Sequence, residues 1–352
     1  MLEDQDSNQI SQSTSWFGRH KVLTAAIVIV GALLLTLVVM NFLPVTVDNT
    51  AMPRPANSHD EAAARVVAVR RAEEESGLIN PVCESILMSH GEITDNVIVF
   101  FHGFTSCPEQ FRELGQQFYD MGYNVYIPLM PHHGYADRDR DALSNTTAEE
   151  LAAFATDAVD IAYGLGNRTV VSGLSGGGTI AAWVAQNRPD VDRAVIVAPF
   201  LGIGFIPAAL NRPLARILDD IPNVDMWWDP QTKENNPNTA AYAYPGYPLH
   251  ALAEYLRLGY ATQDQAKQAK AAANSIVVIS NENDNSVNNA VSNQLVRAWK
   301  EGGEEALSTF DFEAILGLPH DLITPTREDG DTGLVYPVIV EAIEKLLDRD
   351  SS

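Results

Sequence analysis

The stretch 168–187, RTVVSGLSGGGTIAAWVAQN, constrains the fold of this chain more than any other segment. Residues 169–172 predict a short buried strand, and a helix is predicted to begin near Gly176 after a tight turn. The turn carries a G-x-S-x-G pattern centred on Ser175. A serine at such a corner has a strained backbone and an exposed hydroxyl. The helix N-terminus behind it supplies N–H groups for a developing oxyanion. The pattern predicts a nucleophilic serine; a glycine-rich turn that only packs a helix onto a sheet is the alternative.

Beyond about residue 84 the chain alternates short apolar strands with amphipathic helices. This alternation indicates a parallel sheet covered on both faces. We therefore predict an α/β domain over 84–348, with a mostly parallel sheet. Strands are expected over 84–88, 97–101, 124–128, 168–172, 193–198, 275–280 and 308–313, and helices near 108–121, 147–164, 177–187, 287–300 and 334–348.

Residues 200–273 interrupt this alternation with apolar patches, aromatic clusters and prolines. A structureless loop of this length is uncommon in a compact domain. We predict a largely helical cap, inserted between two strands and lying over the C-terminal edge of the sheet. Met226, Trp227 and Trp228 are apolar enough to line an acyl pocket, and equally able to form a small core of the cap. A surface elaboration unrelated to substrate is the alternative for the whole insertion.

A nucleophilic serine needs a histidine to take its proton and an acid to orient that histidine. Asp284 follows the strand predicted over 275–280, and His320 follows the next strand and precedes the last helix. With Ser175 these give the chain order serine, acid, histidine that accompanies this type of corner. Glu282 is the alternative acid, and a histidine satisfied within its own loop is the alternative for His320.

Together with the loop His102-Gly103-Phe104, these residues resemble the α/β-hydrolase family. The narrower resemblance is to its carboxylesterase and monoacylglycerol-lipase-like branch, often described as serine aminopeptidase S33-like. It covers about residues 84–348. The resemblance implies an oxyanion hole formed by the backbone N–H groups of Phe104 and Gly176, and an orienting role for His102.

The resemblance also bears on two neighbours of this site. His133 lies in the sequence PHHG after the strand at 124–128, in a loop that borders the active site of this fold. We expect His133, with His102, to shape the pocket. Asn281 stands where the family commonly has glycine.

The apolar run at 22–43 contains no charged residue. At about 1.5 Å per residue it is long enough to cross a bilayer. A secretory signal peptide would have a shorter apolar region and a small-residue cleavage site, which the following residues do not offer. Arg19 and Lys21 predict, by the positive-inside rule, a cytoplasmic tail over 1–21, which we expect to be disordered. We predict an uncleaved, single-pass signal anchor over 22–44 and an extracytoplasmic catalytic domain.

Two segments join this anchor to the α/β domain. Residues 45–58 contain Pro53 and Pro55 among small polar residues, and this composition predicts a linker. Residues 59–83 predict a membrane-proximal helix, capped by Ser58 or Asp60 and running to about Glu75.

Composition limits the partners. The net charge of −23 over 352 residues argues against nucleic acid and against an anionic lipid surface. The chain has two cysteines, Cys83 and Cys107, and an even number in an exported chain suggests a disulfide. Two free buried thiols are the alternative. No Cys/His spacing indicates a metal site, and we expect no cofactor. The expected partners are a small-molecule ester and the lipid bilayer, through residues 22–44.

These expectations combine into a membrane-anchored serine hydrolase that cleaves carboxylic esters through an acyl-enzyme. The aromatic insertion favours a lipophilic acyl group. Two other readings stay open: an amidase or peptidase of the same fold, and a non-catalytic binding protein. Fold and triad do not separate the first of these from an esterase.

Overall fold

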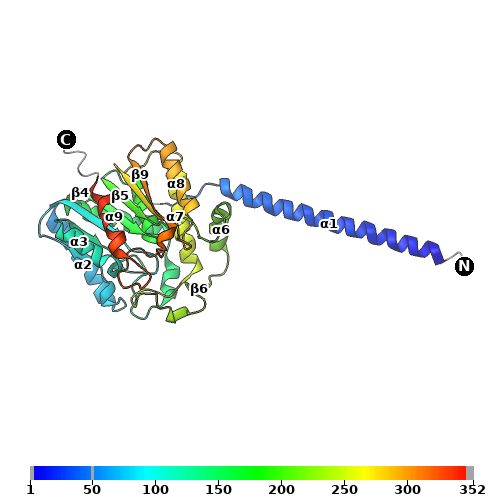
Figure 1. The fold of residues 1–352 in the computed structure, drawn as a ribbon, viewed down its shortest axis with the longest axis horizontal. Helices are drawn as coiled ribbons and strands as arrows, with labels where there is room; N and C mark the ends of the chain where they lie inside the picture. Colours follow the sequence, from blue (N-terminus) through cyan, green and yellow to red (C-terminus); the bar gives the residue numbers. More distant parts are fainter. Residues whose placement is uncertain (1–3, 49–50, 346–352) are drawn as a thin grey trace. The chain divides into compact units, whose positions relative to one another are not determined.

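The structure, a computed structural model, describes residues 4–48 and 51–345. It divides into two units, Met1–Leu43 and Pro44–Ser352. The first unit is the helix α1 (Asp4–Phe42), drawn in blue in Figure 1. Within the described residues, Lys21–Phe42 is the one helical segment long and apolar enough to cross a bilayer, with a mean hydropathy of 2.9. A signal sequence has the same properties.

The expectation of a disordered tail over residues 1–21 is wrong from Asp4 onward, since α1 already begins there. Helix nucleation is unfavourable, but each further residue then adds one hydrogen bond. The apolar run can therefore nucleate a helix that extends into the polar residues before it.

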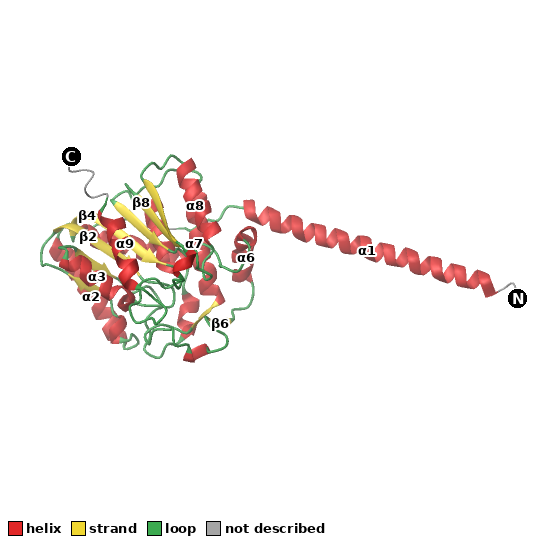
Figure 2. Cartoon of the chain, in the orientation of Figure 1, coloured by secondary structure: helices red, strands yellow, loops and turns green. Residues whose placement is uncertain are grey.

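A seven-stranded sheet forms the centre of the second unit (Figures 1 and 2). Its strand order is β1-β3-β2-β4-β5-β8-β9, with β1 antiparallel to β3 and every other neighbouring pair parallel. The mostly parallel sheet predicted from the sequence is thus confirmed. The strands are β1 (Ile86–Met88), β2 (Thr94–Phe101), β3 (Asn124–Ile127), β4 (Gly166–Leu174), β5 (Arg193–Val197), β8 (Ile276–Asn281) and β9 (Leu307–Phe312).

Helices cover both faces of this sheet, because its strands are apolar on both sides. Along β2, Val97, Val99 and Phe101 belong to one buried cluster, whereas Ile98 and Phe100 belong to another. The first cluster includes residues of α4 (Ala148–Tyr163), α5 (Gly176–Asn187), α7 (Leu249–Ala266) and α8 (Asn289–Glu301); the second includes residues of α3 (Arg112–Asp120) and α9 (Thr332–Glu344). Short 3₁₀ helices complete the chain: η1 (Pro81–Cys83), η2 (Pro108–Phe111), η3 (Arg140–Asn145), η4 (Lys233–Asn235) and η5 (Ala314–Leu316).

The segment predicted as a linker is held against the domain. The backbone N–H of Val45 donates to Asp264 over 2.9 Å, and Arg216 donates to the carbonyl of Pro44 over 2.7 Å. Val45 and Val47 also pack against the larger buried cluster. Apolar side chains in the first part of this segment are therefore packed against the domain.

The helix α2 (His59–Ser76) follows. The side chain of Ser58 accepts a hydrogen bond from the backbone N–H of Glu61, so Ser58, and not Asp60, is the N-cap. Gly77 ends the helix in the left-handed conformation, with φ of 64°. The helix therefore ends at Ser76, close to the end predicted at about Glu75.

The insertion at 200–273 is more than a helical cap. It contains α6 (Ala208–Asp220), and β6 (Asp225–Trp227) pairs with β7 (Gly246–Pro248) as a two-stranded antiparallel sheet. It also contains α7, most of which is buried against α4, α5 and α8. The prediction of a cap over the sheet edge is wrong for α7, which lies in the helical layer because its apolar residues occupy more than one face.

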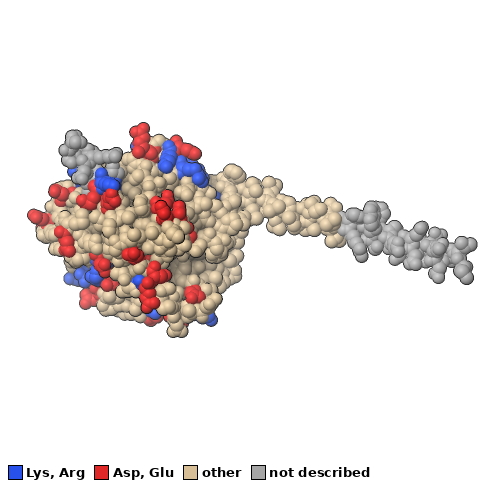
Figure 3. All heavy atoms as spheres, in the orientation of Figure 1, with Lys and Arg blue, Asp and Glu red and all other residues tan. Residues whose placement is uncertain are grey.

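Acidic side chains are spread over the face of the second unit that Figure 3 shows, and do not gather in a single cluster.

Candidate active site

Ser175 lies at the corner between β4 and α5. Its backbone has φ of 58° and ψ of −115°, a combination that favours glycine and is strained for serine. Neighbouring backbone groups stabilise this corner: the Ser175 N–H donates to the carbonyl of Val197, and its carbonyl accepts from the N–H of Phe200, each over 3.0 Å. The corner expected from the sequence is therefore present.

Glycines around the corner let the end of β2 approach the start of α5. A Cβ on Gly177 would lie 1.9 Å from the carbonyl oxygen of Phe101, and one on Gly173 would lie 2.2 Å from that of Gly177. A Cβ on Gly176 would lie 3.0 Å from the backbone nitrogen of Phe104. The two N–H groups expected to form the oxyanion hole are therefore neighbours.

Ser175, His320 and Asp284 form one hydrogen-bonded chain. The Nε2 atom of His320 lies 2.8 Å from Oγ of Ser175, and its Nδ1 lies 2.6 Å from Oδ2 of Asp284. The carboxylate accepts from Nδ1–H, which leaves Nε2 able to accept the serine proton. The Asp284 side chain is fully buried, whereas that of His320 is 23% exposed.

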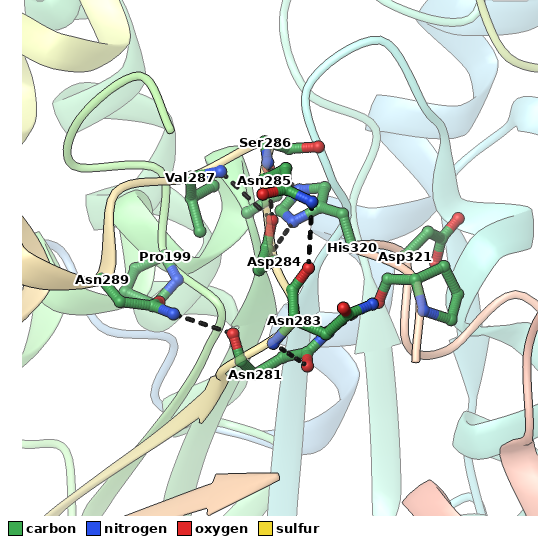
Figure 4. A network of polar contacts seen from close by, with 12 residues as sticks. Pro199, Asn281, Asn283, Asp284, Asn285, Ser286, Val287, Asn289, His320 and Asp321 are labelled. Carbon is green, nitrogen blue, oxygen red and sulfur yellow. Dashed lines mark hydrogen bonds and ion pairs between the residues drawn. The ribbon is translucent and has the colours of Figure 1, made fainter. Parts of the chain in front are cut away.

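The loop after β8 fixes this carboxylate (Figure 4). Oδ1 of Asp284 accepts from the backbone N–H groups of Ser286 and Val287, at 2.8 and 3.2 Å. Glu282, the alternative acid, is exposed and accepts instead from the backbone N–H of Ala314 at 3.1 Å. Of the two acids, only Asp284 is hydrogen-bonded to the histidine.

Asn281 holds the loop that carries the histidine, a role that sequence reasoning missed. It is fully buried, and its side-chain amide donates to the carbonyls of Leu318 and Pro319, at 3.0 Å each. Asn283 donates to the same Leu318 carbonyl. The one signal in the sequence is that an asparagine stands where the resemblance implies glycine.

His102 is buried at the start of the loop His102-Gly103-Phe104, which we call the oxyanion loop after its expected role. Its Nε2 accepts from the backbone N–H of Met130 at 3.1 Å, and its Nδ1 lies 3.0 Å from the carbonyl of Gly103, to which it donates. Burial lowers the pKa of His102 well below its ordinary value, and the neighbouring His133 lowers it further. The imidazole is therefore neutral, which this pair of hydrogen bonds requires.

A cavity of about 300 Å³ opens beside Ser175 and His320. Phe104, Leu174, Trp228 and Tyr244 give it apolar walls. Most of its lining is polar, from loops far apart in the sequence: Thr105, Ser106, Gln110, Asn236, Asn238, Thr239, Ser286, Asp321, Thr324 and Arg327. Sequence reasoning missed these residues, because no local pattern joins them.

Four residues expected to shape this pocket are not among the described residues that line it: His102, His133, Met226 and Trp227. His133 packs behind Phe104, with ring centroids 5.9 Å apart. Trp227 lies under the guanidinium of Arg140, 4.1 Å from its ring centroid. Successive side chains of an extended segment point to opposite sides, so Trp227 and Trp228 cannot both face the cavity.

Cys83 and Cys107 form the predicted disulfide, which excludes two free thiols. Cys107 is also the N-cap residue of η2, directly after the oxyanion loop. Among the described residues, no group of His, Cys, Asp and Glu side chains could hold a metal ion.

Comparison with known proteins places this chain in a family. Residues 92–311 match the family model of the serine aminopeptidase S33 hydrolases. The chain belongs to that family. It is also 30% identical over 193 residues to the thermostable monoacylglycerol lipase of Bacillus sp. (strain H-257), a match that covers 53% of this chain and 69% of the lipase. The resemblance stated from the sequence is thereby confirmed.

Solved structures of low identity share the α/β-hydrolase fold. A metagenome-derived lipolytic enzyme gives a TM-score of 0.57 at 18% identity and covers 76% of this chain and 99% of its own. The monoacylglycerol lipase of Paleococcus ferrophilus gives 0.54 at 17% identity, covering 73% and 96%. A soluble variant of the monoglyceride lipase of Saccharomyces cerevisiae gives 0.56 at 12% identity, covering 75% and 91%.

Proposed function

We propose that this family member is a membrane-anchored serine hydrolase that cleaves carboxylic esters through an acyl-enzyme. The observation that carries the proposal is the hydrogen-bonded chain from Ser175 through His320 to Asp284, at 2.8 and 2.6 Å. The first is a distance at which an imidazole acts as a general base on a hydroxyl, and the second is that of a carboxylate that orients the imidazole.

The proposed reaction begins when His320 takes the proton of Ser175 and Oγ attacks the ester carbonyl. The backbone N–H groups of Phe104 and Gly176 stabilise the resulting oxyanion, each contributing about 3 kcal/mol to the transition state. His320 then returns the proton to the leaving alcohol. In the second half-reaction it activates a water that releases the acid, while Asp284 stabilises the imidazolium in both halves.

Substitution of the nucleophile tests this proposal. Ser175→Ala removes only the attacking oxygen and should lower kcat by about 10⁴–10⁶ at unchanged stability. A fluorophosphonate probe should label the wild-type serine and leave the variant unlabelled. A folded Ser175→Ala protein that keeps a tenth of the activity would place the nucleophile elsewhere. A wild-type chain that the probe does not label would favour the non-catalytic binding protein.

The substrate that we propose is a small ester with a polar alcohol part. Hydroxyl and amide side chains such as Thr105, Asn236 and Thr239 suit the alcohol, while Phe104 and Trp228 offer an apolar wall to the acyl group. The similar lipase from Bacillus supports an acylglycerol-like ester. Monoacylglycerols and p-nitrophenyl esters of increasing chain length, assayed beside aminoacyl anilides, test this choice. Faster turnover of the anilides would favour the peptidase alternative.

The anchoring part of the proposal rests on the apolar helix Lys21–Phe42. The full chain should fractionate with membranes and resist extraction by carbonate. A chain that begins at Pro44 should be soluble and active, because it keeps the contacts of Val45 with the domain. Protease treatment of intact spheroplasts should digest the domain if it lies outside the cytoplasm. Recovery of a full-length soluble protein, or of one cleaved after the helix, would contradict the anchor.

A further inference from the structure

One buried side chain bridges the two loops that the proposed reaction uses. Gln110, in η2, is 4% exposed. Its Oε1 accepts from the backbone N–H of Gly103 at 2.7 Å, and its Nε2 donates to Oδ2 of Asp321 at 3.1 Å. Gly103 directly precedes Phe104, and Asp321 directly follows His320.

The sheet alone does not fix the separation of these loops. The oxyanion loop follows β2, and the histidine loop follows β9. In the strand order, β4, β5 and β8 lie between them. A carbonyl carbon must nevertheless meet the Phe104 N–H and the His320 imidazole at the same time, and small errors in such positions slow catalysis strongly. The Gln110 amide joins the two loops directly.

The direction of the amide is set by its partners. Oδ2 of Asp321 also accepts from the Thr324 hydroxyl at 2.6 Å, and its Oδ1 accepts from the backbone N–H groups of Ile323 and Thr324 at 3.3 and 3.2 Å. Asp321 is thus surrounded by donors, whereas the Gly103 N–H needs an acceptor. Only a side chain with a donor at one end and an acceptor at the other satisfies both.

The helix η2 that carries Gln110 is itself fixed. The backbone N–H of Gln110 donates to the carbonyl of Cys107 at 3.0 Å, and Cys107 forms a disulfide with Cys83. The next residue, Phe111, is fully buried and stacks on Phe100, with ring centroids 4.8 Å apart. The amide therefore extends from a rigid support.

We infer that Gln110 is a positioning residue, which sets the distance between the oxyanion loop and the histidine loop. This inference rests on the proposed hydrolase function. Gln110 acts through Gly103 and Asp321, so its loss should lower kcat and leave KM nearly unchanged.

The variant Gln110→Glu tests the inference with almost no change in shape. The introduced carboxylate can still accept from Gly103, but it faces Asp321 as a second acceptor. At pH 8 we expect kcat per active site to fall about tenfold or more, since loss of a single oxyanion donor costs 10²–10³. The ratio to wild type should recover as the pH falls, because two facing carboxylates share a proton more readily than either binds one alone.

Other ionisable groups surround this pair. His320 and Arg327 line the same cavity. Burial raises the pKa of both Tyr242 and Tyr336, and the charge of Asp321 adds to the shift in each. The charge of Glu109 also raises the pKa of Tyr242, and that of Glu113 raises the pKa of Tyr336. Expressing kcat as a ratio to wild type at each pH removes the titrations that both proteins share.

A double variant separates positioning from simple damage. In Gln110→Glu/Asp321→Asn, the new amide donates to the new carboxylate, and that carboxylate still accepts from Gly103. Activity should return at pH 8, to within about threefold of wild type. Gln116→Glu is the matched control: Gln116 donates to Asp120 at 2.8 Å on the exposed face of α3, and the change should leave kcat unaltered.

All rates are divided by the concentration of serine that a fluorophosphonate labels at completion, so that misfolded protein does not count. The inference is overturned if Gln110→Glu keeps wild-type kcat, if its loss does not vary with pH, or if the double variant is no better than the single one. A wild-type enzyme without turnover would overturn the proposed function, and this inference with it. An active wild type with any of the three results overturns this inference alone.

Discussion

Asn281 and Pro319 are joined by a hydrogen bond of 3.0 Å, from the buried side-chain amide at the end of β8 to the backbone carbonyl just before His320. The acid loop and the histidine loop are therefore connected at their bases as well as through the Asp284–His320 pair. A glycine at this position could not make this contact.

Removal of that amide should loosen the histidine loop. Asn281→Ala leaves the carbonyl of Pro319 without this donor and that of Leu318 with Asn283 alone, and we expect a loss of about 1–3 kcal/mol in the free energy of unfolding. The value of kcat should fall as well, because His320 becomes less well placed. Urea denaturation and steady-state kinetics measure both effects. Asn285→Ala, on an exposed residue of the same loop, is the control; an equal effect there would argue against a specific role for Asn281.

The acid can be assigned by two isosteric changes. Asp284→Asn should lower kcat by about 10⁴, since an amide in this position favours the wrong imidazole tautomer. Glu282→Gln should keep nearly full activity, because the Glu282 side chain accepts from the backbone N–H of Ala314, which a glutamine oxygen can also do. The pair is measured on one ester substrate at a single pH. A large loss in Glu282→Gln with a small one in Asp284→Asn would reverse the assignment.

The two adjacent tryptophans should differ in their effect on selectivity. Trp228 lines the cavity and donates from Nε1 to Oγ1 of Thr105 at 2.9 Å, whereas Trp227 packs under Arg140. Trp228→Ala should change the ratio of short- to long-chain ester turnover several-fold, because part of the acyl wall is lost. Trp227→Ala should alter stability and leave that ratio at its wild-type value. If both variants have the same ratio of short- to long-chain ester turnover, Trp228 does not contribute to the acyl wall.

Burial of neutral histidines should make the domain sensitive to acid. The desolvated site of His133 lowers its pKa to about 4, against about 6.5 when unfolded. Between these values the unfolded chain binds a proton that the folded one does not. Stability therefore falls as the pH drops from 6.5 to 4, by about 3 kcal/mol for this group. Burial raises the pKa of Glu73 and Asp157, which act in the opposite direction.

Comparison with a His133 variant separates the contribution of this histidine to the pH dependence of stability from those of Glu73 and Asp157. His133→Asn keeps an amide nitrogen at the position of Nδ1, which donates to the carbonyl of Pro131 at 2.7 Å, but it does not titrate. Its unfolding free energy, measured in denaturant at pH 7, 6 and 5, should vary less with pH than that of the wild type. Parallel curves would show that His133 titrates alike in the folded and unfolded chains, so that its pKa is not lowered by folding.

The disulfide should contribute to stability and to catalysis. It closes a separation of 24 residues, for which the chain-entropy model gives about 3 kcal/mol. The double variant Cys83→Ser/Cys107→Ser should lose a large part of this stabilisation. Its kcat should also fall, because the disulfide holds Cys107, which directly precedes the helix that carries Gln110. Denaturation and kinetics of the variant, beside wild type with and without reductant, measure both. Unchanged kcat in a destabilised variant would confine the disulfide to a structural role.

The sequence predicted those features that depend on local pattern. The apolar strands, the glycine corner at Ser175 and the order of Asp284 and His320 each follow from a short segment, and each is present. The cavity was harder to predict, since Thr105, Asn238 and Arg327 meet only through the tertiary fold. Trp227 and Trp228 could not be told apart by hydrophobicity, because the side that each faces depends on the pairing of β6 with β7.

The position of α7 divides the insertion into a fixed part and an exchangeable one. Because α7 is buried between α5 and α8, it cannot be removed without exposing the main sheet's helical layer. The stretch at 221–248 precedes it and supplies the cavity residues Trp228, Asn236, Asn238, Thr239 and Tyr244. That stretch can therefore be exchanged as one segment, in evolution or by design, with junctions after α6 and before α7. Substrate preference in such chimeras can change while the scaffold that carries the nucleophile stays intact.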